Sequence, residues 1–233
     1  MRALVIQHDH VSPHGPVGER LEQRGYDVVE HEVVPAHNFL SPGVTTDFPD
    51  VSGFDLVVPM GAPWASYDET IGTWVKPELE LLREADRTGI PVLGICFGGQ
   101  LLALAHGGTV AKARQAEFGW VSIESDDEAL VPAGPWFQWH HDGWTVPPEA
   151  QEIARNAAAS QAFVLRRNLA VQFHPELTSA MLAGWYGNGG ADALRSEGRD
   201  PEAIYAATVT EEPTAVQRAH GLVDAFLDRV AGA

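Results

Sequence analysis

The fold of this chain is decided by the stretch Pro91-Val92-Leu93-Gly94-Ile95-Cys96-Phe97-Gly98-Gly99-Gln100-Leu101-Leu102-Ala103-Leu104-Ala105. Its first five residues are apolar and partly β-branched, as in a short buried parallel strand, and the residues after Cys96 have helical composition. A sharp strand-to-helix turn is therefore predicted at Cys96, the single cysteine among 233 residues. Gly94 and Gly98, placed symmetrically around it, would let the strand and the helix approach closely.

This turn would present the Cys96 thiol as a nucleophile. The start of a helix places free N–H groups and the positive end of the helix dipole beside the sulfur, which favours thiolate over thiol. A lone cysteine is, however, often a small buried apolar residue. The interpretation therefore depends on a base elsewhere in the sequence.

That base is predicted in the stretch Ala170-Val171-Gln172-Phe173-His174-Pro175-Glu176, a second short strand that ends in ionisable residues. His174 can accept the thiol proton and later return it to a leaving group. Because Pro175 fixes φ, Glu176 points to the same side of an extended chain and can hold the tautomer of the imidazole. We predict that Cys96, His174 and Glu176 act together.

A third unit, Phe54-Asp55-Leu56-Val57-Val58-Pro59-Met60, is predicted to be a strand that runs into the turn Gly61-Ala62-Pro63-Trp64. The backbone of such a turn can approach a ligand closely. Attack on an acyl carbon builds negative charge on oxygen, which backbone N–H groups stabilise. One donor is expected at Phe97, directly after the nucleophile, and the Gly61-Ala62 turn is the natural source of the other.

At these residues the chain resembles the class I glutamine amidotransferases, which use a Cys-His-Glu triad. Within that superfamily it is similar to stand-alone proteins that are like the amidotransferase domain of GMP synthase, from about residue 2 to about residue 185. The matching motifs are Gly94-Ile95-Cys96-Phe97-Gly98-Gly99-Gln100, His174-Pro175-Glu176, Gly61-Ala62-Pro63, Tyr67-Asp68-Glu69, Glu117-Phe118-Gly119-Trp120 and Phe137-Gln138-Trp139-His140-His141-Asp142.

The resemblance implies a role for each matching residue. Cys96 would be the nucleophile, His174 the general base and acid, and Glu176 the residue that orients His174. Ala62 and Phe97 would give the oxyanion N–H donors. The implied substrate-binding residues are Gly61, Gln100, Trp139, His141 and Asp142, the last three through their backbone. The implied reaction is hydrolysis of the side-chain amide of L-glutamine through a γ-glutamyl thioester, with ammonia passed to an acceptor.

One position departs from the family pattern. The family usually has two glycines before the proline of the oxyanion turn, whereas this chain has Gly61-Ala62. If position 62 requires a positive φ, alanine costs about 1 kcal/mol and tilts the N–H donor.

Two other functions stay open on the same residues. A γ-glutamyl hydrolase or peptidase would use the same triad on a larger substrate, and it would need an open pocket beyond the γ-carboxyl group. A non-catalytic regulatory relative would keep the fold, although three intact triad residues speak against it.

The sequence has no Gly-x-x-x-x-Gly-Lys-Ser/Thr phosphate loop. Ammonia acceptor chemistry is therefore expected on another chain, a synthetase or ligase.

Composition predicts a single domain, with a core over 1–185 and a helical C-terminal extension over 186–233. The chain is 45% hydrophobic and has a net charge of -17, which disfavours nucleic acid and anionic membranes as partners. The absence of a long apolar run or signal peptide, together with one cysteine, predicts a cytoplasmic protein. His8-Asp9-His10 and His140-His141-Asp142 lack metal-site spacing, so neither a metal nor another cofactor is expected.

The predicted fold class is α/β, a doubly wound and mostly parallel sheet with flanking helices, flavodoxin-like. Ligands of such sheets bind outside the carboxyl ends of the strands, where the three motifs fall. The other expected elements are strands at Arg2–Gln7 and Tyr26–Glu30, helices at Gly15–Arg24 and Trp74–Thr88, antiparallel strands near 109–124 and 160–173, a loop at Gly184–Gly190 and an amphipathic helix at Thr214–Val230.

Overall fold

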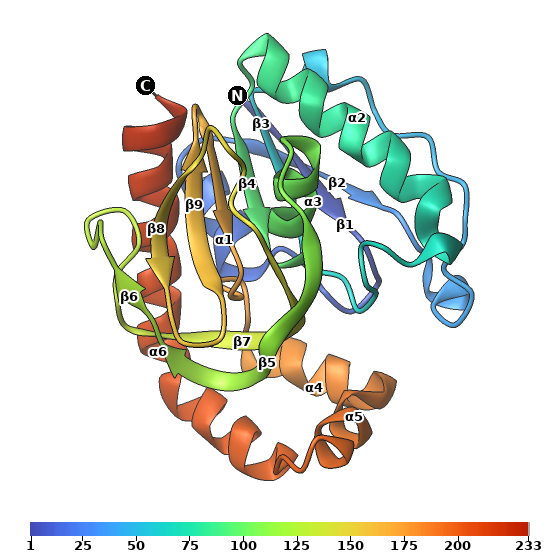
Figure 1. Ribbon diagram of the computed structural model, residues 1–233, viewed down its shortest axis with the longest axis vertical. Helices are drawn as coiled ribbons and strands as arrows, with labels where there is room; N and C mark the ends of the chain where they lie inside the picture. The colour runs from blue at the N-terminus through green and yellow to red at the C-terminus, as the bar shows by residue number, and fades with distance from the viewer. Residues whose placement is uncertain (233) are drawn as a thin grey trace.

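An eight-stranded sheet forms the centre of the computed structural model, which describes residues 1–232. Its strand order is β2-β1-β3-β4-β10-β9-β8-β6 (Figure 1). The strands are β1 (Arg2–Gln7), β2 (Asp27–Glu32), β3 (Leu56–Pro59), β4 (Val92–Ile95), β6 (Glu124–Ser125), β8 (Gln151–Arg155), β9 (Ser160–Leu165) and β10 (Asn168–Val171). From β2 to β10 neighbouring strands are parallel, and the remaining pairs are antiparallel. The predicted flavodoxin-like fold class is confirmed.

Helices cover both faces of the sheet, as the alternation of buried side chains along β1 requires. Leu4 packs with Trp74 of α2 on one face, and Val5 shares the other with Phe226 of α6. Figure 1 shows α2 and α3 on one side of the sheet and α6 on the opposite side. The covering helices are α1 (Gly15–Gln23), α2 (Gly72–Thr88), α3 (Phe97–Ala105) and α6 (Pro201–Phe226). Short 3-10 turns occur at Ala36–Asn38, Val51–Gly53 and Glu69–Ile71.

A separate two-stranded sheet crosses the carboxyl ends of the parallel strands (Figure 1). It pairs β5 (Val110–Ser122) with β7 (Pro135–Trp144) in antiparallel register. The strand expected near 109–124 is therefore long, and its partner β7 was not predicted. The expectation of antiparallel strands over 160–173 is wrong in part, because β10 runs parallel to β4 while pairing antiparallel with β9.

The C-terminal region is helical almost throughout. The predicted loop at Gly184–Gly190 is instead the end of α4 (Ser179–Trp185) and a wide helical turn (Tyr186–Gly190), broken at Asn188 and Gly189, where φ is 95°. A short α5 (Ala191–Ser196) follows. The predicted helix at Thr214–Val230 lies within the longer α6 and the turn Leu227–Ala231 after it. Helix α6 starts earlier because the Asp200 carboxylate accepts a bond from the Ala203 N–H, and Pro201 suits a first turn.

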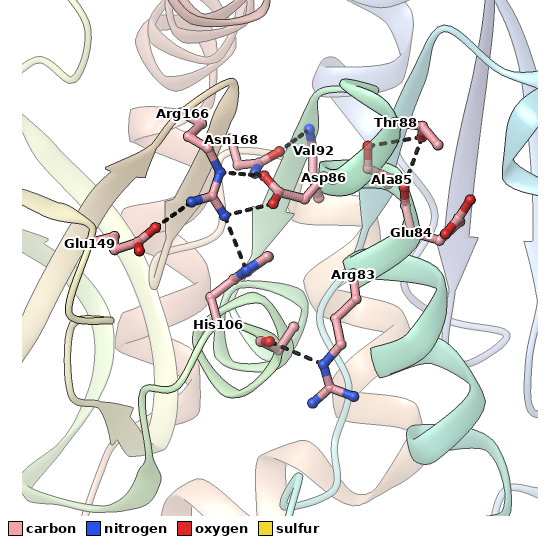
Figure 2. A network of polar contacts seen from close by, with 11 residues as sticks. Arg83, Glu84, Ala85, Asp86, Thr88, Val92, His106, Glu149, Arg166 and Asn168 are labelled. Carbon is pink, nitrogen blue, oxygen red and sulfur yellow. Dashed lines mark hydrogen bonds and ion pairs between the residues drawn. The ribbon is translucent and has the colours of Figure 1, made fainter.

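A network of polar contacts lies at the amino ends of β4 and β10 (Figure 2). The Arg166 guanidinium donates to both carboxylate oxygens of Asp86 and to Glu149, while Asn168 joins Asp86 to the Val92 N–H at 3.0 Å. Burial alone would raise the pKa of Asp86, but Arg166 and Asn168 lower it below its usual value. The network therefore ties α2 to the amino ends of β4 and β10.

None of the helices within residues 1–232 combines the length and the apolar character needed to cross a membrane.

Candidate active site

Cys96 lies at the predicted turn, directly between β4 and α3, in a strained backbone conformation with φ 49° and ψ -105°. Two bonds hold the turn from either side. The Cys96 N–H donates to the Val171 carbonyl at 2.7 Å, and the Gly98 N–H donates to the Met60 carbonyl at 3.0 Å. Strand β10 and the end of β3 therefore fix the position of the sulfur.

The glycines that flank Cys96 allow this geometry. A Cβ atom at Gly94 would lie 2.8 Å from the Gly98 carbonyl oxygen, and one at Gly98 would lie 2.0 Å from the Pro59 carbonyl oxygen. Both neighbours are backbone atoms, which cannot move aside as a flexible side chain can. Helix α3 can therefore start against β3 and β4 only with glycine at these positions.

The ring of His174 is paired with Glu176 behind it. Nδ1 of His174 lies 2.8 Å from Oε1 of Glu176, and both side chains are buried. A bond from the His174 N–H to the Phe137 carbonyl, 2.8 Å long, fixes the backbone against β7. Nε2 of His174 has no hydrogen-bond partner among residues 1–232, and the residue lines the same pocket as Cys96. The second ring nitrogen is thus available to the sulfur or to a ligand.

Electrostatics at the site favour a charged His174. Burial opposes the charge, but the Cys96 thiolate and the Glu176 carboxylate outweigh burial and hold the pKa of His174 well above its ordinary value of 6.5. A protonated His174 at the wall of the pocket is placed to donate to a ligand.

The predicted site residues meet at one pocket of about 1010 Å³. Glu176 is the exception, because it lies fully buried behind His174. The site residues that line the pocket are Gly61, Ala62, Cys96, Phe97, Gln100, Trp139, His141, Asp142 and His174. Four segments that are far apart in the sequence therefore contribute to one concave surface.

The condition under which Ala62 would be strained, a positive φ, is not met in the Gly61-Ala62 turn. Among residues 1–232 only Cys96 and Arg166 have a positive φ without being glycine, so Ala62 adopts an ordinary conformation. The glycine is required at Gly61 instead, where a Cβ atom would lie 2.9 Å from Cε1 of His174. No hydrogen bond within the described residues uses the N–H of Ala62 or of Phe97. Both donors are free for a ligand oxygen.

Strand β7 lines the pocket with four consecutive residues, Trp139–Asp142. The β5–β7 register runs from Lys112 opposite Asp142 to Glu117 opposite His140, so the bulge leaves His141 without a facing residue. Its side chain lies 3.2 Å from Glu197.

Sequence reasoning missed Gln172, which is fully buried beside Cys96. Its Nε2 donates to Sγ of Cys96 at 3.5 Å, and its Oε1 accepts from Nε2 of Gln100 at 3.4 Å. The signal was its position two residues before His174 on an extended chain, which places both side chains on one side. Tyr67, which belongs to one of the matching motifs, donates its hydroxyl to Asp142 at 3.0 Å.

The two His/Asp stretches are used in other ways. His8 pairs with Glu78 at 3.0 Å, and His140 pairs with Glu117 at 3.1 Å, all four side chains being buried. Asp9 accepts bonds from neighbouring groups in its own loop. Across residues 1–232 no three His, Cys, Asp or Glu side chains are grouped so that they could hold a metal ion.

Fold and site together define a doubly wound α/β protein with a cysteine, a histidine and a glutamate at the carboxyl ends of its parallel strands. The profile of the family described as glutamine amidotransferase class-I matches residues 19–182, well over half of the chain. The chain belongs to this family, as its motifs suggested.

Individual relatives agree with this assignment. The chain is 41% identical over 100 residues to a glutamine-hydrolysing GMP synthase subunit of Sulfurisphaera tokodaii, covering 39% of this chain and 53% of that protein. It is 38% identical over 130 residues to the glutamine-hydrolysing GMP synthase of Lactobacillus delbrueckii subsp. bulgaricus, covering 52% of this chain and 24% of that one. The chain thus spans about half of the first relative and about a quarter of the second.

Solved structures share the fold over nearly the whole chain. A glutamine amidotransferase from Thermotoga maritima superposes with a TM-score of 0.82 at 24% identity, covering 100% of this chain and 99% of that one. A glutamine amidotransferase from Methylobacillus flagellatus gives 0.79 at 24% identity, covering 97% and 94%.

Proposed function

We propose that this protein hydrolyses the side-chain amide of L-glutamine through a γ-glutamyl thioester on Cys96. The observation that carries the proposal is the meeting of Cys96, the paired His174 and two free backbone N–H groups at one pocket. The Cys96 thiolate attacks the amide carbon, and the oxyanion that forms accepts bonds from the N–H groups of Ala62 and Phe97.

Release of ammonia requires a proton at the leaving nitrogen. His174 gives that proton, the C–N bond breaks, and a thioester remains on Cys96. His174 then takes a proton from water, whose oxygen attacks the thioester carbon. Glutamate leaves as the C–S bond breaks and the sulfur is restored. Glu176 keeps the His174 ring oriented through both steps.

Residues on the other walls of the pocket would hold the substrate. Gln100 and Gly61 are proposed to contact its side chain, and the backbone at Trp139, His141 and Asp142 its α-amino and α-carboxylate groups. The position of these three residues on the pocket wall, beside the register shift of the β5–β7 pair, supports this assignment.

The ammonia is proposed to pass to a synthetase or ligase on a separate chain. One relative is named as one subunit of a GMP synthase, and the matched part of the other covers only 24% of a longer synthase. Both names fit an amidotransferase unit that works beside a larger acceptor unit.

The test is the release of ammonia and glutamate from L-glutamine by the purified protein, with L-asparagine as the shorter control. We expect the two products from L-glutamine in equal amounts, and much less turnover of L-asparagine. If L-glutamine is not turned over by the protein alone or by the protein mixed with an ATP-dependent GMP synthetase subunit, the proposal is wrong.

A γ-glutamyl hydrolase is the second candidate, and the size of the pocket favours it. Its volume of about 1010 Å³ far exceeds what a glutamine side chain fills, and Phe39 and Trp64 form part of its wall. The ratio of kcat/KM for γ-glutamyl anilide to that for L-glutamine separates the two candidates. A ratio well above one would favour the hydrolase.

The pH dependence of turnover tests the role of Glu176. Activity that needs the His174 imidazolium is present below the pKa of His174 and is lost as the pH rises through it. Because Glu176 helps to raise that pKa well above 6.5, we expect Glu176→Gln to move the alkaline limb of the kcat profile to lower pH. Glu149→Gln, in an exposed ion pair outside the pocket, should leave the limb in place. An unmoved limb in Glu176→Gln would contradict the role.

A further inference from the structure

We propose that His8, held by Glu78, is a positioning residue that fixes the orientation of the oxyanion donor at Ala62. The inference rests on the proposed function. It concerns two buried residues outside the triad, His8 in the loop after β1 and Glu78 on α2. Neither residue forms a hydrogen bond with Cys96.

The His8 ring spans the distance between the oxyanion turn and α2. Nδ1 of His8 lies 3.1 Å from the Gly61 carbonyl oxygen, and Nε2 lies 3.0 Å from each carboxylate oxygen of Glu78. Both side chains have no exposed surface. The ring is also packed edge-on against Phe97, with centroids 4.9 Å apart. One imidazole therefore contacts the residues that carry both oxyanion donors, Phe97 directly and Ala62 through Gly61.

The contact between His8 and the Gly61 carbonyl also sets the direction of the Ala62 N–H. The Gly61 carbonyl and the Ala62 N–H belong to the same trans peptide unit, in which they point in opposite directions. Because the carbonyl is held toward buried His8, the N–H faces the other way, and Ala62 lines the pocket. Rotation of this unit would turn a carbonyl oxygen toward the developing negative charge.

The partners of the ring also fix its protonation. The Gly61 carbonyl and the Glu78 carboxylate are both acceptors, so the ring donates from both nitrogens only as an imidazolium. Burial would lower the pKa of His8, but Glu78, Gly61 and the nearby Asp9 together raise it above 6.5. A charged donor on the carbonyl strengthens the N–H of the same peptide as a hydrogen-bond donor.

A matched pair of double variants isolates the bond to Gly61. His8→Leu with Glu78→Leu replaces both partners by apolar groups and so avoids an unpaired buried charge. His8→Asn with Glu78→Leu differs only at position 8, where the Asn amide nitrogen restores a donor near the position of Nδ1. Removing one oxyanion donor costs about 10²- to 10³-fold in rate. We expect the Leu/Leu variant to lose about 10- to 100-fold in kcat for L-glutamine, and the Asn/Leu variant to recover most of it.

Alkylation of Cys96 by iodoacetamide distinguishes a misplaced Ala62 N–H from a general disruption of the site around Cys96. Displacement at a saturated carbon forms no oxyanion, so the alkylation rate should stay within about twofold of wild type in both variants. His106→Gln, a half-buried histidine at the Arg166 network, is the control and should leave kcat unchanged. Equal loss of alkylation and turnover, or equal kcat in the two double variants, would overturn the inference.

A measurement on the unaltered protein covers the case in which the variants do not fold. The ¹⁵N chemical shift of His8 Nδ1 should show a bound proton at pH 7, and an unprotonated Nδ1 would overturn the inference. Turnover of L-glutamine by wild type is measured first. If the wild-type protein does not hydrolyse L-glutamine, the proposed function fails. If it does, and the His8 variants have the same kcat, only the positioning role is rejected.

Discussion

Replacing Cys96 by alanine should lower the rate of glutamine hydrolysis by about 10⁴-fold or more, because the covalent route needs the sulfur. Alanine keeps a Cβ atom at the strained turn, so the fold and the pocket should remain. Ammonia release, followed with a coupled assay, is the measurement. Glutamine binding by calorimetry should persist in the variant, which would show that the loss lies in chemistry.

The single cysteine makes this prediction unusually clear to check. A γ-glutamyl group trapped by acid quench and located by mass spectrometry can lie only on Cys96 if it is a thioester, since residues 1–233 hold no other thiol. Turnover within tenfold of wild type in the alanine variant would contradict the covalent mechanism. It would also remove the argument for His174 as the acid.

Replacing Gly98 by alanine should destabilise the protein by about 3 kcal/mol or more. The added Cβ would lie 2.0 Å from the Pro59 carbonyl oxygen, and neither α3 nor β3 can retreat without breaking the bond from Gly98 to Met60. Overpacking of a core typically costs about 1–3 kcal/mol, and contact with backbone belongs to the upper end. The free energy of unfolding, measured in urea, tests this value.

Gly221→Ala is the matched control for the same chemical change. Gly221 lies inside α6, is exposed, and has open space where a Cβ would go. Alanine there should stabilise the protein by about 0.5–1 kcal/mol, because glycine is a poor helix former. If both variants were destabilised alike, close packing at the nucleophile turn would not be the cause.

The parts of the site that lie within one short stretch of sequence could be predicted, because the hydrophobic pattern and the residue types of that stretch define them. The apolar run before Cys96 and the helical run after it give a strand, a turn and a helix without knowledge of any other segment. The His174–Glu176 pair is likewise separated by one residue, so its geometry follows from an extended chain.

Parts of the site that depend on distant pairing were not accessible in this way. His8 meets Glu78 across 70 positions of sequence, and neither residue stands in a pattern that marks the other. The bulge in β5 arises from its register with β7, which only the folded sheet defines. Around Gly189 the sequence Gly187-Asn188-Gly189-Gly190 favours a loop, and no local signal revealed that helical turns continue on both sides of it.

The Arg166 network has a consequence for how this protein can diverge. It secures the amino ends of β4 and β10, while the opposite ends carry Cys96 and lead to His174. The pocket wall also includes residues 39–43 and 188–190, which contribute neither a triad member nor a core strand. Under the proposed function, substitutions in those segments would reshape the pocket without replacing Cys96, His174 or Glu176. The range of substrates would then be able to diverge while the reacting residues stay the same.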